Sequence, residues 1–196
     1  MEILFKDKDI AVLEKPIGMD SEKDVPKELQ DRLGGSFYTV HRLDQNVGGV
    51  MVYARNSKTA AELSRQIQNG DFQKEYVALV HGIPEETGDW TDLLFKDSRK
   101  NKVFVVKKER NGVKKARLTY CRLRAGEQSL VRIRLHTGRS HQIRVQFSSR
   151  GFPLVGDHKY GSRAKESAPM LYSCCLSFDL NGRKIFEKYP SWAIEQ

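Results

Sequence analysis

Short apolar runs separated by charged turns predict strands at both ends of the chain. Residues 3–16 hold two such runs around a charged turn, a pattern typical of an opening hairpin that ends at Lys15 and Pro16. Near the other end, residues 170–180 and 183–188 are rich in apolar and aromatic side chains and predict two closing strands. A sheet is therefore expected to contain both ends of the chain.

Further strands are predicted between these ends, at residues 48–56, 72–82, 113–124 and 129–136. Successive side chains of a strand point to opposite faces. In the last of these strands one face would carry the apolar side chains of Val131, Ile133 and Leu135. The other face would carry Arg132, Arg134 and His136. This alternation is typical of a sheet that packs on one side and is charged on the other.

Three helices are predicted from start and stop signals. The first is a short helix over residues 25–33. The second would be capped by Ser57, with an apolar stripe formed by Ala60, Leu63 and Ile67, and would end at Asn69 and Gly70. The third would run from His141 to about Ser149, with Ser140 as its cap and with Gly151 and Pro153 ending it.

Many strands and few helices, in an order that does not strictly alternate, predict the α+β class. We expect a large, mostly antiparallel mixed sheet flanked by a few helices and loops. The 196 residues show no internal repeat and no linker rich in Pro, Gly or Ser, so one compact domain over residues 1–196 is expected.

Composition narrows the class of protein. No apolar run approaches the roughly 20 residues that cross a bilayer, and charged residues interrupt the first ten positions, so neither a membrane span nor a signal peptide is predicted. A cytoplasmic location is therefore expected. The three cysteines, Cys121, Cys174 and Cys175, are an odd number and include a vicinal pair in a predicted strand, which favours reduced, structural thiols.

The chain is basic, with 34 Lys and Arg against 25 Asp and Glu and a formal net charge of +9. Such a charge favours polyanionic partners, although solubility alone would also explain it. The distribution favours a nucleic-acid partner. Basic residues cluster within what is expected to be one hairpin and in the strands that follow it: Lys107, Lys108, Arg110, Lys114, Lys115, Arg117, Arg122, Arg124, Arg132 and Arg134.

One acidic residue stands out in the segment HRLDQNVGG, residues 41–49. Asp44 comes just before a glycine pair and a strand, so its carboxylate is expected on a loop held by a rigid sheet edge. Gly48 and Gly49 would permit a positive φ or the close approach of another backbone, including that of a ligand. An ion pair of Asp44 with Arg42, and an ordinary turn or bulge at the glycines, are the structural alternatives.

With HRLD, the glycine pair and the apolar strand after it, the chain resembles the RNA pseudouridine synthases of the RluA family. Three other stretches agree in the same order: DKDIAVLEKPIGM, FQKEYVALVHG and HTGRSHQIRVQFSSRGFPLVGDHKYG. The resemblance covers roughly residues 3–178. It implies the pseudouridine synthase catalytic fold and an enzyme that detaches the base of a target uridine, rotates it and reattaches it through carbon.

The resemblance also implies roles for individual residues. Asp44 would be the catalytic aspartate, and Arg144 would pair with it. Tyr76 would stack on the flipped base and assist proton removal. His41 and Arg42 would help to hold the RNA open, with Lys15 and Arg139 at the rim of the site.

The expected partner is ribosomal or transfer RNA, and the expected oligomeric state is a monomer. Neither a metal nor an organic cofactor is expected, because the reaction involves no redox change. His141 is interpreted as an RNA or backbone hydrogen-bond partner. Many relatives carry an extra N-terminal RNA-binding domain of the S4 type, whereas here the fold is expected to begin by residue 3. The grip on RNA would then come from the basic stretch 96–124, which includes Lys114 and Lys115.

The sequence departs from the family pattern at Val47 and Gly48, where the family usually has small hydroxyl residues. This change would remove hydrogen bonds of the loop without affecting Asp44.

Two other functions are considered. One is a catalytically inactive RNA-binding module with the same fold. The other is a metal-dependent nuclease using Asp44, His136, His141 and Asp157, which lack a familiar ligand spacing.

Overall fold

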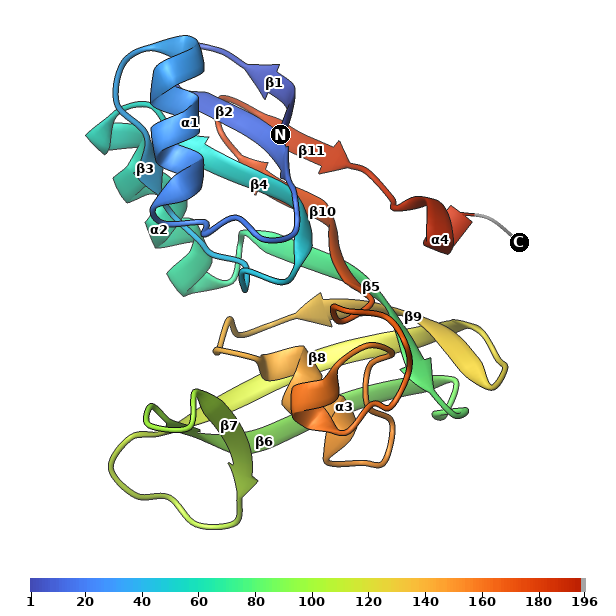
Figure 1. Ribbon diagram of the computed structural model, residues 1–196. Coiled ribbons are helices and arrows are strands. Elements are labelled where there is room, and N and C mark those ends of the chain that lie inside the picture. Colours follow the sequence, from blue (N-terminus) through green and yellow to red (C-terminus); the bar gives the residue numbers. More distant parts are fainter. Residues whose placement is uncertain (195–196) are drawn as a thin grey trace. The chain divides into compact units, whose positions relative to one another are not determined.

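The computed structural model describes residues 1–194 and divides into two compact units (Figure 1). Unit 1 comprises Met1–Lys74 together with the C-terminal segment from Tyr172 onward. Unit 2 comprises Glu75–Leu171. The expectation that residues 1–196 act as one catalytic domain stays a prediction.

Unit 1 is built on strands from both ends of the chain, as the apolar runs predict. Its strands are β1 (Glu2–Lys6), β2 (Ile10–Lys15), β3 (Tyr38–Thr39), β4 (Gly48–Ala54), β10 (Leu171–Asp179, with its first residue in unit 2) and β11 (Arg183–Glu187). They are ordered β1-β2-β4-β10, with β3 paired to β4 and β11 paired to β10. β4 and β10 run parallel, and the other pairs are antiparallel.

Helices α1 (Asp24–Leu33) and α2 (Ser57–Asn69) accompany these strands, and a short helix α4 (Ser191–Ile194) follows β11. Leu63 of α2 is fully buried in the apolar core, and Ala60 and Ile67 pack against that core, which confirms the predicted stripe. The predicted cap was wrong by one residue. The side chain of Asn56, and not Ser57, accepts a hydrogen bond from the N–H of Thr59 at 2.8 Å.

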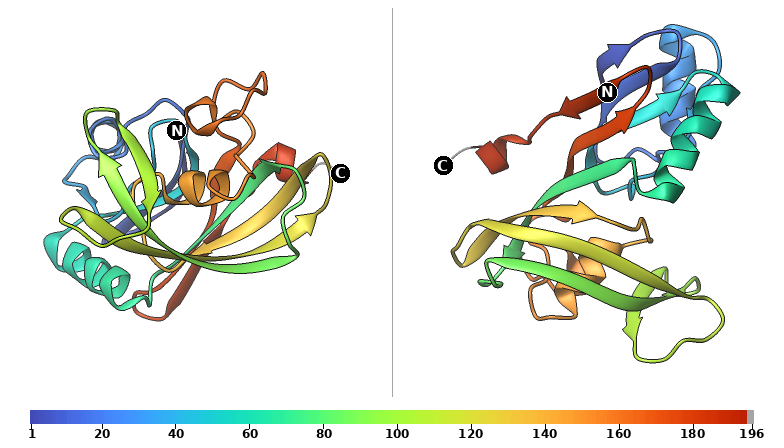
Figure 2. Two further views of the ribbon diagram at one scale, coloured as in Figure 1. Left: turned by 90° about the horizontal axis from the view of Figure 1, so that it is seen from below. Right: turned by 180° about the vertical axis from the view of Figure 1, so that it is seen from behind.

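Unit 2 holds the strands β5 (Gln73–His81, with its first two residues in unit 1), β6 (Thr87–Asp97), β7 (Lys102–Val106), β8 (Val113–Arg124) and β9 (Gln128–Leu135). Their order is β5-β9-β8-β6-β7. Strands β6 and β7 were not predicted. Strand β6 pairs with β7 on one side and with β8 on the other. The basic segment after β7 therefore connects β7 to β8 across β6 (Figure 2). The expected hairpin in this segment was wrong.

Helix α3 (Gln142–Ser148) and the 3-10 helix η1 (His158–Tyr160) complete unit 2. The predicted cap of α3 was also wrong, because His141 occupies the N-cap position without a side-chain capping bond. The two faces of β9 alternate as predicted, except that Leu135 on the apolar face and Arg132 on the charged face are each half-buried. Val131 and Ile133 are fully buried, whereas Arg134 and His136 are exposed.

The α+β class with mostly antiparallel strands is thus confirmed. Within residues 1–194, no helix has both the length and the apolar character needed to cross a bilayer.

Gly49 allows β10 to approach β4 closely. Its φ is +128°, and a Cβ atom placed on it would lie 2.4 Å from the carbonyl oxygen of Ser173 in β10. Both expected reasons for a glycine here, a positive φ and the approach of another backbone, are therefore observed, and that backbone belongs to the protein. The parallel register of Gly49 with Ser173 depends on the missing side chain.

We predict that Gly49→Ala destabilises the protein more than Gly182→Ala. Both glycines have φ above +100°, but a Cβ on Gly182 would meet nothing within 4 Å. The control should lose only the cost of an unfavourable φ, about 1–2 kcal/mol. Gly49→Ala should lose a further 1–3 kcal/mol or so from overpacking. Urea denaturation measures both, and equal losses would show that β10 can move away without cost.

Candidate catalytic side chains

Asp44 lies in the loop that leads into β4. Its own carbonyl oxygen accepts a hydrogen bond at 2.9 Å from the N–H of Val47, which closes a tight turn. The flanking side chains of Leu43 and Val47 are buried, whereas Asp44 itself is half-buried. The apolar neighbours thus fix the turn, while Asp44 keeps part of its surface exposed. Val47, one of the two departures from the family pattern, here serves as an anchor.

A second loop, residues 16–21, holds this turn in place. The N–H of Gly18 donates to the carbonyl of Gln45 at 2.8 Å, and the side-chain amide of Gln45 donates back to the carbonyl of Gly18 at 2.9 Å. The Ser21 hydroxyl donates to the carbonyl of Leu43 at 3.1 Å. The backbone on both sides of Asp44 is therefore tied to the segment that follows β2.

The side chain of Lys15 links the loop of residues 16–21 to the turn that follows Asp44. Lys15 is fully buried, and its ammonium donates to the carbonyls of Pro16 and Met19, each at 2.9 Å, and of Gln45 at 3.3 Å. Burial lowers the pKa of Lys15 to about 8, and the negative charges of Asp20, Asp44 and Asp24 act in the opposite direction. The three carbonyls give Lys15 a role in positioning the Asp44 loop. Its expected contact with RNA stays a prediction.

His41 is also buried, with 7% of its surface exposed. Its Nε2 accepts a hydrogen bond from the N–H of Val52 in β4 at 3.2 Å, and its ring lies 5.6 Å from that of Phe72 between centroids. Burial, reinforced by the charge of Lys74, lowers the pKa of His41 to about 3, so the ring is neutral. These contacts give His41 a structural role, and RNA binding by its side chain stays a prediction.

Arg42 presents the opposite case, with an exposed side chain. Its guanidinium pairs with Glu22 at 3.1 Å, and about half of each side chain is exposed. An exposed pair of this kind contributes little to stability. Arg42 can therefore exchange Glu22 for another anion at small cost, which fits the predicted contact with RNA.

In unit 2, Arg144 of α3 is a buried cation held by a bidentate ion pair. Its Nε and Nη2 donate to the two carboxylate oxygens of Asp157 at 2.7 and 2.9 Å, and both side chains are buried. The guanidinium carbon also lies 5.2 Å from the ring centre of Tyr160. Arg144 thus does bind a carboxylate. The expected pair with Asp44 would join the two units and stays a prediction.

Tyr160 connects this pair to its surroundings. Its hydroxyl accepts a hydrogen bond from the N–H of Val103 at 2.9 Å and lies 2.8 Å from Nδ1 of His141. The hydroxyl oxygen has two lone pairs and one proton, so it can either donate to Nδ1 or accept from it. His141 itself has a positive φ of 50°. The partner observed for Nδ1 of His141 is thus a side chain of unit 2, and the expected contact of His141 with RNA stays a prediction.

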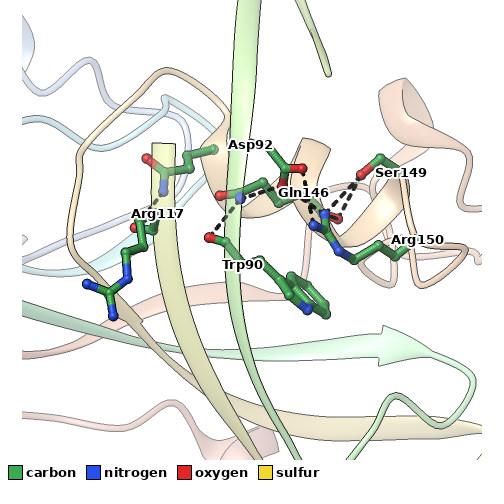
Figure 3. Close-up of polar contacts among 7 residues, drawn as sticks. Trp90, Asp92, Arg117, Gln146, Ser149 and Arg150 are labelled. Atoms are coloured by element: carbon green, nitrogen blue, oxygen red, sulfur yellow. Dashed lines mark hydrogen bonds and ion pairs between the residues drawn. The ribbon is translucent and has the colours of Figure 1, made fainter. Parts of the chain in front are cut away.

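Helix α3 is further anchored by glutamine and arginine side chains (Figure 3). The Gln146 amide and the Arg150 guanidinium both donate to Asp92 of β6, at 2.7 and 2.8 Å. Arg150 also lies over the ring of Trp90, 4.3 Å from its centre. At the other end, Gln142 donates to the carbonyl of Arg117 in β8 at 3.1 Å. The helix that carries Arg144 is therefore held to two strands.

The remaining predicted residues lie in different environments. Tyr76 lies in β5 with only 5% of its surface exposed. Arg139 is exposed and donates to the carbonyl of Lys115 at 3.0 Å, beside the exposed side chains of Lys114 and Lys115. Unit 2 thus brings Arg139 close to this basic pair. The contacts of all four residues with RNA stay predictions.

Three buried polar residues were not predicted as part of the site: Lys74, Asp157 and Tyr160. Asp157 had been considered only as a metal ligand, although both it and Tyr160 stand in the GDHKYG stretch. Its carboxylate binds Arg144, while His136 hydrogen-bonds Thr119 and His141 hydrogen-bonds Tyr160. No group of three His, Cys, Asp or Glu suited to a metal occurs within residues 1–194.

Comparison with known proteins gives consistent matches. A family model described as RNA pseudouridylate synthase matches residues 9–149. The chain is 32% identical over 192 residues to an RNA pseudouridine synthase of Aquifex aeolicus that is itself called uncharacterized, covering 88% of this chain and 60% of that protein. It is 31% identical to ribosomal large subunit pseudouridine synthase D of Borreliella burgdorferi, covering 96% and 64%. It is 28% identical to tRNA pseudouridine synthase C of Pasteurella multocida, covering 97% and 86%.

The chain therefore spans less than two thirds of the length of the first two relatives. Among solved structures, human RNA pseudouridylate synthase domain containing 4 superposes with a TM-score of 0.82 at 21% identity, covering 98% of this chain and 90% of that one. At this identity the similarity shows the fold alone.

We predict that Asp157→Asn destabilises the protein by about 3–5 kcal/mol, because it replaces the charged bidentate partner of the buried guanidinium of Arg144 by a neutral amide. The matched control is Asp89→Asn, which removes a bidentate partner of Arg117 in an exposed pair and should have little effect. Urea denaturation measures both variants. A small effect of Asp157→Asn would mean that Arg144 readily finds another partner.

Proposed function

This chain belongs to the RluA family of RNA pseudouridine synthases, and we propose that it converts specific uridines of structured RNA to pseudouridine, with Asp44 as the catalytic residue. The observation that carries the proposal is the family match over residues 9–149, which includes Asp44, Tyr76 and Arg144. We further propose that it acts as a monomer in the cytoplasm.

The proposed reaction is an isomerisation within one nucleotide. The bond between C1′ of the ribose and N1 of uracil breaks, the base rotates, and a bond between C1′ and C5 forms. C5 loses its proton and N1 ends with one, so the balance requires no oxidant or reductant. Asp44 would engage the nucleotide, either at the base or at the sugar.

The target base must first leave the RNA stack. A stacked or paired uridine cannot present its glycosidic bond to a side chain, and extracting it costs a few kcal/mol. Stacking on an aromatic ring recovers about 1–3 kcal/mol per base. In this proposal Tyr76 provides that ring and assists the removal of the proton.

Asp44 must stay ionised to act, although the site would lose water when the base enters. A nearby arginine favours the carboxylate, because arginine remains charged at any physiological pH. We propose Arg144 for this role. Its support is the rigidity of Arg144: the bidentate bond to Asp157 uses Nε and Nη2, which fixes the direction of Nη1. A guanidinium can bind a carboxylate on each of two edges.

For the grip on RNA we propose the basic residues of unit 2. Lys107, Lys108 and Arg110 in the connection after β7 are exposed, as are Lys114 and Lys115 at the start of β8. Arg42, Arg139, His41, His141 and Lys15 would contribute at the site itself. Relatives named for ribosomal RNA and for transfer RNA both occur among the matches, and the proposed substrate is one of these two classes.

We predict that Asp44→Asn folds and binds RNA but loses pseudouridine formation by at least about 1000-fold, the scale expected when a residue that reacts with the substrate is removed. Asp31→Asn, at an exposed position of α1, is the matched control and should keep full activity. Release of tritium from 5-tritiated uridine in RNA measures the reaction. Full activity of Asp44→Asn would remove the basis of the assignment.

Affinity for RNA should depend steeply on salt, with log K falling by about 0.7 per tenfold rise in salt for each phosphate neutralised in a single strand. The double variant Lys114→Gln, Lys115→Gln should have a slope smaller by up to about 1.4, two such contributions. Lys58→Gln, at an exposed position of α2, should leave the slope unchanged. If all three proteins share one slope, these lysines do not contact phosphates.

A further inference from the structure

Lys74 is a buried lysine for which the structure provides no counter-charge. It is the second residue of β5, and 9% of its surface is exposed. Burial lowers the pKa of its ammonium, and no charged group of the described chain counteracts that effect. Within residues 1–194, no hydrogen bond or ion pair of its side chain is found. The side chain is largely buried, although Nζ itself is not one of the fully buried atoms that lack a partner and so keeps some contact with solvent. An ammonium in such a place loses part of its hydration without gaining a counter-charge.

The other two prominent buried cations show what Lys74 lacks. Lys15 donates to three backbone carbonyls. Arg144 binds both oxygens of Asp157. The fold thus supplies acceptors where a buried cation serves the structure. Lys74 has neither carbonyls nor a carboxylate, so its structural role is not apparent.

The neighbours of Lys74 are short of acceptors as well. Burial lowers the pKa of His41, and the positive charge of Lys74 lowers it further. Because Nε2 of His41 accepts the N–H of Val52, the proton of the neutral ring is on Nδ1. Nδ1 is buried and has no hydrogen-bond partner in the described part of the chain. Two neighbouring side chains therefore hold N–H donors for which unit 1 supplies no acceptor.

We propose that Lys74 binds a phosphate of the RNA substrate, at or next to the target uridine. This inference rests on the proposed function. A partner that offsets the burial of an ammonium must carry a full negative charge, and in RNA the phosphates are the groups that do so. The carbonyl oxygens of uracil could accept a hydrogen bond but would leave the charge uncompensated.

The position of Lys74 in the sequence agrees with this role. His41, its neighbour, is three residues from Asp44 in the HRLD segment. Lys74 also precedes Tyr76 by two residues in β5, so strand periodicity directs both side chains to the same face, about 6 to 7 Å apart along the strand. A phosphate bound by Lys74 would then belong to the nucleotide that stacks on Tyr76 or to the adjoining one.

The proposal is tested with Lys74→Met, which keeps the length of the side chain and removes its charge. Lys6→Met, at an exposed strand position of unit 1, is the matched control. The probe is a fluorescent dodecamer of adenosines with one central uridine, which fixes the register of the target, and affinity is measured by anisotropy. Lys74→Met should weaken binding by about tenfold or more, as expected for the loss of a hydrogen bond to a charged group, and should reduce the salt slope by about 0.7. Its urea midpoint should rise, because an uncompensated buried charge is gone.

Weaker RNA binding together with a higher urea midpoint is not expected of a lysine with a purely structural role. If Lys74→Met binds RNA as tightly as Lys6→Met, the proposal is overturned. A series of dodecamers with one neutral methylphosphonate linkage each identifies the contact. For the wild type one linkage should cost affinity, and for Lys74→Met the same linkage should cost nothing further. Additive losses at every linkage would overturn the phosphate contact.

Failure of the proposed function is recognised separately. If the wild type forms pseudouridine in RNA while Lys74→Met binds like the control, only the role of Lys74 is wrong. If the wild type neither binds the dodecamer nor forms pseudouridine in RNA, the proposed function is wrong, and the role of Lys74 with it.

Discussion

The loop that carries Asp44 is organised around the ammonium of Lys15. Three carbonyl oxygens, from Pro16, Met19 and Gln45, accept its hydrogen bonds, and two of them belong to the loop after β2 while the third belongs to the turn after Asp44. Without this ammonium the carbonyls would be left with fewer donors in a buried place, which is costly for backbone groups. The close approach of Ser173 to Gly49 fixes the start of β4 just beyond the same turn. Together these contacts convert a flexible loop into a defined position for one carboxylate.

Buried charge is used in three different ways in this chain. Lys15 has backbone carbonyls, Arg144 has Asp157, and Lys74 has neither. The first two arrangements hold parts of the fold that carry proposed catalytic residues. For Lys74, we propose that a phosphate of the RNA substrate supplies the missing partner. Exposed cations attract RNA to a basic protein over a long range. A largely buried cation without a partner instead favours a phosphate at one defined position.

Much of the fold could be predicted from the sequence, because its strands are short apolar runs bounded by turns. The strands around Val50, Val77, Val131 and Leu176 and the stripe of α2 follow directly from periodicity. The strand β6 was missed, since Thr87–Asp97 is mostly polar and its pattern is weak. The strand β7 was also missed, although Lys102–Val106 is a short apolar run of the kind that predicts a strand. Helix caps were displaced by one residue at Asn56, where two capping types stand in a row, and at His141, which is not a capping type and occupies the N-cap position with a positive φ.

For the candidate site, residue types alone identified Asp44 as unusual, and family motifs supplied Tyr76 and Arg144. The partner of Arg144 in unit 2, Asp157, lies 13 residues away, and no local periodicity links the two positions. The isolation of Lys74 could not be predicted either, because burial without a partner is a property of the tertiary structure. Motifs thus supplied the residues proposed for catalysis, whereas the contacts that hold them in place became visible only in three dimensions.

The central claim is that this chain is an RNA uridine isomerase in its own right, and chemical mapping of pseudouridine tests it most directly. Unmodified transcripts of ribosomal and transfer RNA would be incubated with the purified protein and then sequenced at single-nucleotide resolution. The account predicts pseudouridine at one or a few defined uridines, with neighbouring uridines unchanged. Transcripts that bind the protein but contain no pseudouridine after incubation would contradict it.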